Sequence, residues 1–98
     1  MSTVILNSNE FEFSYYNRNT YFNETGLSST ATISGLKGTN VADTLTSLAE
    51  DTISLIQIKK DNNIIYSLED INAKIQSFDE SYDGNNFNVN LNINFNMT

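Results

Sequence analysis

The sequence predicts a mainly β protein of the α+β class: a small antiparallel sheet or sandwich with one short helix. Two observations lead to this prediction. Apolar and polar residues alternate along several segments, which is the period of strands with one buried face, and a single segment has helical spacing instead. Because 98 residues hold only one small core, we expect one domain over residues 1–98.

The first 25 residues predict a strand and a turn. From Glu10 to Tyr16 the apolar side chains Phe11 and Phe13 alternate with polar ones, as in a half-buried strand. Residues 17–19 (Asn-Arg-Asn) predict a turn, since Asn tolerates turn geometry, and Tyr21-Phe22 would begin a return strand. We therefore expect residues 1–25 to form an extended arm or an edge hairpin.

The next segment is predicted to be a loop, a strand and a bend. Residues 23–29 are polar and include Gly26, which indicates a loop, whereas the β-branched run 30–34 favours a strand. Residues 35–38 (Gly-Leu-Lys-Gly) then predict a bend. The short strand between these breaks belongs to the same small sheet.

The helix is predicted over residues 41–49. Val41, Leu45, Leu48 and Ala49 have the i, i+4, i+7, i+8 spacing of one helical face. Asn40 is a suitable N-cap, and the carboxylate of Asp43 suits the exposed amides of the first turn. A helix this short depends on packing for its stability.

The C-terminal half predicts a four-strand antiparallel meander over residues 52–59, 63–68, 71–82 and 86–96. The first segment carries isoleucine and leucine on both faces, which indicates a central strand. Asp61-Asn62-Asn63 predicts the first turn, and Asp83-Gly84 predicts a type I′ hairpin before the last strand.

The last strand has the clearest pattern in the chain. Its apolar face comprises Phe87, Val89, Leu91, Ile93, Phe95 and Met97, and its other face is a row of carboxamides, Asn88, Asn90, Asn92, Asn94 and Asn96. Asparagine is a poor strand former, and a carboxamide row lies in water or hydrogen-bonds a neighbouring chain. We therefore expect this face to be available for contacts with protein.

Composition limits the possible functions. A net charge of −7 repels a phosphate backbone, so direct nucleic-acid binding is not expected. The longest apolar run, Val4 to Leu6, is too short for a transmembrane helix. The amino terminus has no signal-peptide pattern, which predicts assembly in the cytoplasm and no membrane contact.

Few residues suit catalysis or metal binding. Histidine and cysteine are absent, so the usual general base and thiol nucleophile are missing, and we expect no enzyme and no cofactor. Glu10 and Glu12 share one side of a strand, as any Glu-x-Glu segment does. Residues 79–84 match the first half of a calcium loop, but the expected Glu is replaced by Asn90; a hairpin turn and a weak calcium site both remain open.

The aromatic residues near the amino terminus complete the candidate interface. Aromatic side chains bury large areas, and tyrosine keeps a polar end for the rim of an interface. The predicted interface residues are Tyr15, Tyr16, Tyr21, Phe22, Asn88, Asn90, Asn92 and Asn94. We predict no catalytic, cofactor-binding or metal-binding residues.

The C-terminal half resembles small β-rich structural proteins of tailed-bacteriophage virions. The likeness lies in residues 64–68 (Ile-Ile-Tyr-Ser-Leu), 75–78 (Ile-Gln-Ser-Phe), 83–84 (Asp-Gly) and 88–95, which alternates Asn with apolar residues. The resemblance implies a non-enzymatic, multicopy subunit of the phage head, as capsid decoration, or of the neck or tail. Such a subunit binds other virion proteins and forms homo-oligomers after assembly in the host cytoplasm.

Two other functions remain open from the sequence. A carbohydrate-binding β-module would use the tyrosines to stack on sugar rings. A small acidic inhibitor of a host protein would mimic nucleic-acid charge, which requires carboxylates gathered on one face.

Overall fold

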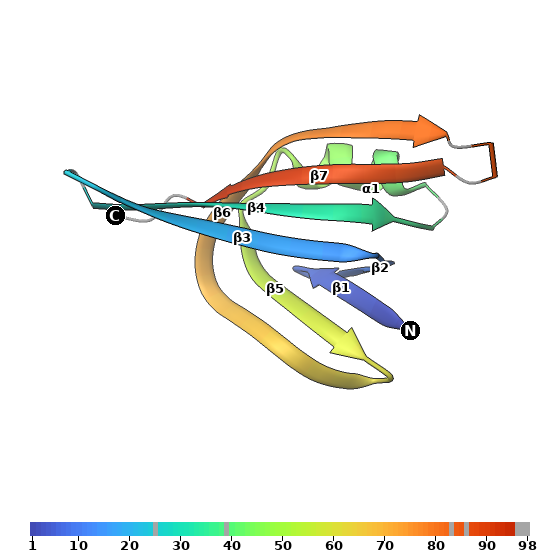
Figure 1. Cartoon of the computed structure of the whole chain (residues 1–98), viewed down its shortest axis with the longest axis horizontal. Helices are drawn as coiled ribbons and strands as arrows, with labels where there is room; N and C mark the ends of the chain where they lie inside the picture. The colour runs from blue at the N-terminus through green and yellow to red at the C-terminus, as the bar shows by residue number, and fades with distance from the viewer. Residues whose placement is uncertain (25, 39, 83, 86, 96–98) are drawn as a thin grey trace.

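The computed structural model describes residues 1–24, 26–38, 40–82, 84–85 and 87–95, without the side chains of Asn23 and Leu27. The elements in chain order are β1 (Ser2–Leu6), β2 (Asn9–Glu12), β3 (Tyr15–Asn23), β4 (Gly26–Leu36), α1 (Val41–Leu48), β5 (Ile53–Lys60), β6 (Asn63–Tyr82) and β7 (Phe87–Phe95) (Figure 1). The predicted mainly β fold, with one short helix in the described part of the chain, is confirmed.

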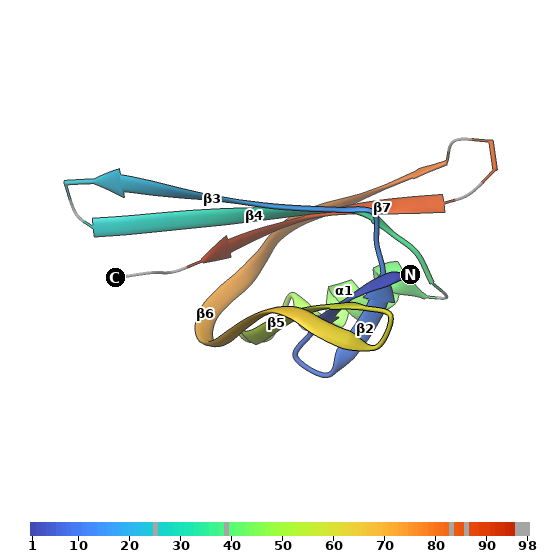
Figure 2. The same cartoon turned by 60° about the horizontal axis from the view of Figure 1, so that its bottom comes forward.

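All strands belong to one antiparallel sheet of order β2-β1-β5-β6-β7-β4-β3. The sheet bends strongly, so that β3, β4, β7 and the end of β6 form one layer, while β1, β2, β5 and the start of β6 form the other (Figure 2). A bridge between Glu12 and Lys37 joins β2 to the segment after β4. The sheet therefore curls back on itself around its core.

Strand β6 makes the bend, because its first half pairs with β5 and its second half with β7. Between the pairs Leu55–Glu69 and Ile53–Ala73, β6 advances four residues while β5 advances two, and Asp70 adopts a positive φ of 55°. This is a bulge, which strengthens local bending. The predicted C-terminal meander is confirmed, but segments 63–68 and 71–82 form one 20-residue strand with no chain reversal between them.

The core lies between the layers and uses the predicted apolar faces. In β7 the side chains of Val89, Leu91, Ile93 and Phe95 are buried, whereas Phe87, at the start of the strand, is exposed. Met97 and Asn96 fall outside the described residues. The core residues are Val4, Leu6, Phe11, Ala31, Ile33, Leu36, Val41, Leu45, Leu48, Ile53, Ile56, Ile58, Ala73, Val89, Leu91, Ile93 and Phe95.

Helix α1 forms where the spacing predicts it, and Val41, Leu45 and Leu48 are its buried residues. The expected side-chain cap is wrong. Asn40 occupies the N-cap position in the left-handed region (φ 61°, ψ 32°), and its side chain makes no capping hydrogen bond. Its carbonyl instead accepts the first helical hydrogen bond, from Thr44. Packing therefore holds this short helix.

The predicted N-terminal elements are partly wrong. The strand expected over residues 10–16 ends at Glu12 and resumes at Tyr15, where the chain crosses between layers. Residues 17–19 lie within β3 and form no turn. Strand β1 was not predicted, because its five residues show too little alternation. It pairs with both β2 and β5.

The predicted loop over residues 23–29 is also too long. Strand β3 ends at Asn23 and β4 begins at Gly26, so the two form a tight hairpin. Within the bend expected at 35–38, the structure has a β-bulge between Ile33 and Leu36 and a bend at Gly38. Gly35 has a φ of +72° there, and a Cβ on it would lie 2.5 Å from Ser14 Oγ. Only glycine fits this close approach without a shift of Ser14.

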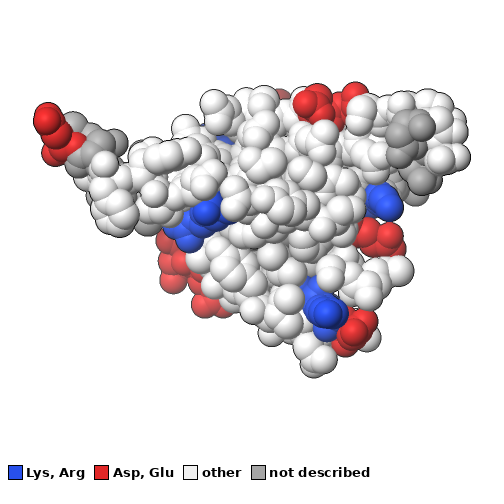
Figure 3. Space-filling model, viewed as in Figure 1, with Lys and Arg blue, Asp and Glu red and all other residues white. Residues whose placement is uncertain are grey.

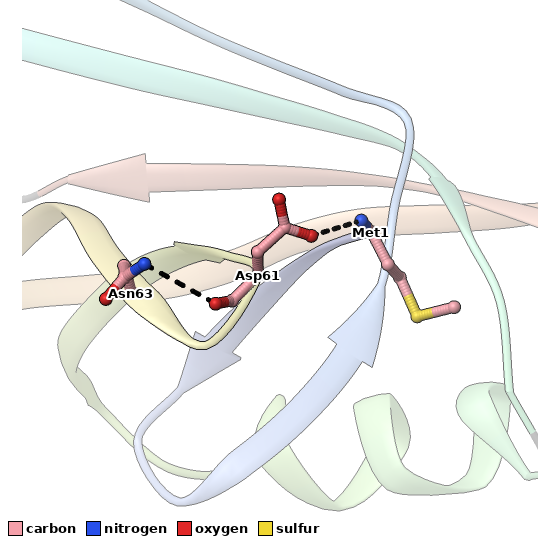
Figure 4. A network of polar contacts seen from close by, with 3 residues as sticks. All are labelled: Met1, Asp61 and Asn63. Carbon is pink, nitrogen blue, oxygen red and sulfur yellow. Dashed lines mark hydrogen bonds and ion pairs between the residues drawn. The ribbon is translucent and has the colours of Figure 1, made fainter.

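The turn between β5 and β6 is confirmed at Asp61-Asn62, where both residues have the positive φ of a type I′ hairpin (51° and 70°). The Met1 amino group lies 3.0 Å from Asp61 Oδ1, and Asn63 Nδ2 donates to the Asp61 carbonyl oxygen (Figure 4). In the second predicted turn Gly84 has a φ of 95°, while Asp83 falls outside the described residues.

Candidate functional site

The carboxamide row of β7 lies on the outer face of the β3-β4-β7-β6 layer, away from the core. Strand register brings four rows of side chains onto this surface, which we call the polar face. The polar face comprises Tyr15, Asn17, Asn19 and Tyr21 of β3, Ser28, Thr30, Thr32 and Ser34 of β4, Asn88, Asn90, Asn92 and Asn94 of β7, and Lys74, Ser77, Asp79 and Ser81 of β6.

Part of the carboxamide row is engaged within the sheet. Asn92 Nδ2 donates to Ser77 Oγ at 3.2 Å, and Asn92 Oδ1 accepts from Thr32 Oγ1 at 3.2 Å. Asn90 Nδ2 donates to Asp79 Oδ1 at 3.1 Å. These bonds tie β7 to both neighbours, which explains how a strand rich in a poor strand former is stable. Asn94 is exposed, but Asn90 and Asn92 are engaged in these bonds, so the row is less open to partners than its sequence predicts.

The four aromatic residues of β3 do not form one cluster, because alternation divides them between two faces. Tyr15 and Tyr21 stand exposed on the polar face, 56% and 53% accessible. Tyr16 and Phe22 lie on the opposite face. The four residues are close together in the sequence, but only those that share a face of the strand can contact the same partner.

Tyr16 is partly buried and packs against Tyr66 of β6. Their ring centroids are 5.3 Å apart with an interplanar angle of 55°, and their hydroxyl oxygens are 3.1 Å apart. Burial raises the pKa of the Tyr16 phenol strongly, and the hydrogen bond and the charge of Tyr66 raise it further. The positive charge of Arg18 lowers this pKa and so opposes these effects. Tyr16 therefore joins the two layers.

Arg18 was expected in a turn, and the structure gives it another role. Its guanidinium carbon lies 4.7 Å from the centre of the Phe95 ring, and its Nε donates to the buried Ser29 Oγ at 2.8 Å. Ser29 Oγ in turn donates to the Asn19 carbonyl at 3.1 Å. The side chain of Arg18 thus packs against its own sheet, and the other residues of β3 are uncharged.

Strand β3 is an open edge of the sheet. It is nine residues long and lies last in the strand order, so that no described strand pairs with its outer side. The opposite edge is different: β2 has four residues, two of them glutamates, and Lys37 bonds to its end. Unpaired amides and carbonyls along a long edge are a template for another strand.

The β3–β4 hairpin extends beyond the second layer (Figure 2). Phe22, on the face that the second layer does not cover there, is 84% exposed. A phenylalanine this exposed leaves a large apolar ring in water. At the far end of the molecule, the exposed rings of Tyr82 and Phe87 pack against each other with their centroids 4.9 Å apart and an interplanar angle of 41°.

Glu10 and Glu12 border a cleft of about 550 Å³ between the β1–β2 hairpin and Lys37-Gly38. Both carboxylate oxygens of Glu10 are engaged: Oε2 accepts from Thr3 Oγ1 at 2.8 Å, and Oε1 lies 3.9 Å from Lys59 Nζ. These contacts hold the Glu10 side chain against β1 and β5, on the surface of the sheet.

The possible calcium loop has strand geometry in its described part. Residues 79–82 are extended within β6, and Asp79 accepts a hydrogen bond from Asn90. Of the three proposed donors, Asp79 and Ser81 lie on the polar face of β6, and Asp83 falls outside the described residues. Among the described residues, no group of three or more His, Cys, Asp or Glu is placed to hold a metal.

Acidic groups are dispersed on the face shown in Figure 3, at the β3–β4 tip and at several separate places along the body. This distribution gives no concentrated negative surface on that face. Among the described residues, no helix has the length and apolar character needed to cross a bilayer.

Comparison with protein-family models, with curated proteins and with solved structures finds no match to this chain.

Proposed function

We propose that this chain is a non-enzymatic assembly subunit, which binds copies of itself or neighbouring structural proteins through its open strand edge and its polar face. The resemblance of its C-terminal half to virion proteins of tailed bacteriophages supports a place in the head, neck or tail of such a particle. In this proposal the protein is assembled in the host cytoplasm and contacts neither nucleic acid nor membrane directly.

The observation that supports this proposal best is the contrast between the two edges of the sheet. Proteins that remain monomeric shorten, charge or cover their edge strands, and β2 has these features. Strand β3 has none of them: it is long, it contains no proline, and its one charged side chain bends inward over Phe95. Such an edge suits strand addition, in which main-chain hydrogen bonds supply the affinity.

The polar face supports the same proposal. Of its sixteen residues only Lys74 and Asp79 are charged, in a chain whose net charge is −7. The cores of protein interfaces are depleted in charge and enriched in tyrosine, and Tyr15 and Tyr21 stand on this face. The surface therefore has the composition of one that contacts protein repeatedly.

The proposal is tested by locating the protein in infected cells. Particles are purified through a density gradient and their proteins identified by mass spectrometry, with the abundance of this chain compared with that of the major capsid protein. A constant multicopy ratio across particle fractions is expected. Detection only in soluble extract, with none in intact particles, would overturn the virion assignment.

A carbohydrate-binding module is the second candidate, because Tyr15 and Tyr21 flank Asn17 and Asn19 on one exposed face. Tyrosine rings with amides between them suit stacking on sugars and hydrogen bonding to their hydroxyls. A glycan array separates the two: selective binding that is lost in both Tyr15→Ala and Tyr21→Ala would favour this candidate over assembly.

A further inference from the structure

We propose that the partner of the β3 edge is β3 of a second copy, and that the two strands pair antiparallel about Asn19. This inference rests on the proposed assembly function and names the partner and the register. Antiparallel pairing of identical strands gives a two-fold interface in which each copy contributes the same residues. Strand overlap, side-chain matching and the covering of Phe22 each favour this pairing.

The overlap step fixes the register. Strand β3 runs from Tyr15 to Asn23, and Asn19 is its middle residue. Pairing about Asn19 is the one antiparallel register in which all nine residues of both strands oppose each other. Any other register leaves main-chain groups of the edge without partners, and each unpaired group removed from water costs free energy.

The side-chain step favours the same register. It places Asn19 opposite Asn19 of the second copy on the polar face, where two carboxamides satisfy each other as donor and acceptor. It places Arg18 opposite Thr20, so no charged residue opposes another. Two chains of net charge −7 repel overall, and a nearly uncharged edge is where they meet at least electrostatic cost.

The third step explains the exposed Phe22. In this register Phe22 lies opposite Tyr16 of the second copy, on the face of β3 opposite to the polar face. Tyr16 marks the end of β3 that lies over the second layer, where it packs on Tyr66, whereas Phe22 lies on the overhanging end (Figure 2). The two-fold axis therefore places the end of each β3 that the second layer does not cover beside the end of the other β3 that it does cover. Each Phe22 ring gains a cross-strand aromatic partner.

The absence of cysteine makes the register directly testable. Asn19→Cys introduces a single thiol, and in the proposed dimer the two Cα atoms lie at the strand-pair distance of about 4.5–5.5 Å, which a disulfide spans. Ser47→Cys, exposed on α1, is the matched control for random collision. Under glutathione oxidation at micromolar protein, we expect Asn19→Cys to form a covalent dimer at least about tenfold faster than Ser47→Cys.

A second measurement tests Phe22. Sedimentation equilibrium of the full chain is expected to show a dimer, whose dissociation constant rises about tenfold or more in Phe22→Ala, the effect of losing an aromatic anchor. Phe87→Ala removes another exposed phenylalanine ring, from the far end of the molecule, and is expected to leave the constant unchanged. Circular dichroism confirms that both variants fold.

The outcomes separate this inference from the proposed function. A wild-type chain that stays monomeric at several hundred micromolar overturns the self-pairing, and so does an oligomer in which Asn19→Cys cross-links no faster than Ser47→Cys. In either case the presence of the protein in purified particles still upholds assembly with other proteins. Absence from particles together with a cross-linked dimer overturns the virion assignment and leaves the β3 pairing in place.

Discussion

The Tyr16–Tyr66 contact predicts how the stability of this protein depends on alkaline pH. The folded state holds the Tyr16 proton more tightly than the unfolded chain does, because burial and the hydrogen bond to Tyr66 raise its pKa. An unfolded tyrosine titrates near pH 10. Above that pH, unfolding releases a proton, so the free energy of unfolding falls as pH rises, by up to about 1.4 kcal/mol per pH unit. The contribution is fully present below pH 10.

The size of the effect follows from this linkage. At pH 11 one such tyrosine has cost the folded state about 1.4 kcal/mol relative to neutral pH. Replacing Tyr16 by Phe removes the titrating group and also the hydrogen bond to Tyr66, which costs about 0.5–1.5 kcal/mol at neutral pH. We therefore expect Tyr16→Phe to be less stable than the wild type at pH 7 and to equal it by about pH 11.

Urea unfolding followed by far-ultraviolet circular dichroism measures this difference at pH 7, 9, 10 and 11, without interference from tyrosine fluorescence. Tyr15→Phe is the matched control, since it removes an exposed phenol from the neighbouring position of the same strand. Only Tyr16→Phe is expected to approach the wild type as pH rises. A constant difference between Tyr16→Phe and the wild type from pH 7 to pH 11 would show that folding does not raise the pKa of Tyr16.

Three further predictions concern the core, the polar face and the bulge. Leu91→Ala, at a fully buried position of β7, is expected to lower the free energy of unfolding by about 2–5 kcal/mol in urea titrations. Asn92→Ala breaks two cross-strand hydrogen bonds and is expected to lower the free energy of unfolding by about 1–2 kcal/mol. Asn94→Ala, at an exposed position of the same strand, is expected to change it by less than about 0.5 kcal/mol. Equal losses would contradict a stabilising role for the hydrogen bonds of Asn92. Gly35→Ala is expected to cost about 1–3 kcal/mol, and Ser14→Gly is expected to restore part of that loss in a thermal melt, because it removes the side chain that the new Cβ meets.

Local pattern was sufficient to predict the elements with strong periodicity. Alternation in β7 predicted its buried face, and helical spacing predicted α1, because each buries its apolar side chains on one face. The Asp61-Asn62 turn was predictable because both residues tolerate positive φ. These features depend on residues close together in the sequence.

Features that depend on distant partners were not predictable. Asn17 and Asn19 have turn propensity, but pairing with β4 and the contact of Arg18 with Phe95 hold residues 17–19 in a strand. The continuity of β6 depends on a bulge that sequence pattern does not distinguish from a turn. In the candidate site, the division of the four aromatic residues between two faces was not predictable, because it requires knowing that one strand carries them all.

The shared strand β6 has a consequence for how this molecule opens. Ala73 is the register partner of Ile53 in β5 and of Phe95 in β7, so one fully buried residue lies in both halves of the sheet. Detachment of either half from the other therefore breaks the pairing of this backbone segment. Amide hydrogens around Ala73 are therefore expected to exchange with solvent only in the cooperative event that unfolds the entire protein, while those at the β3–β4 tip exchange first.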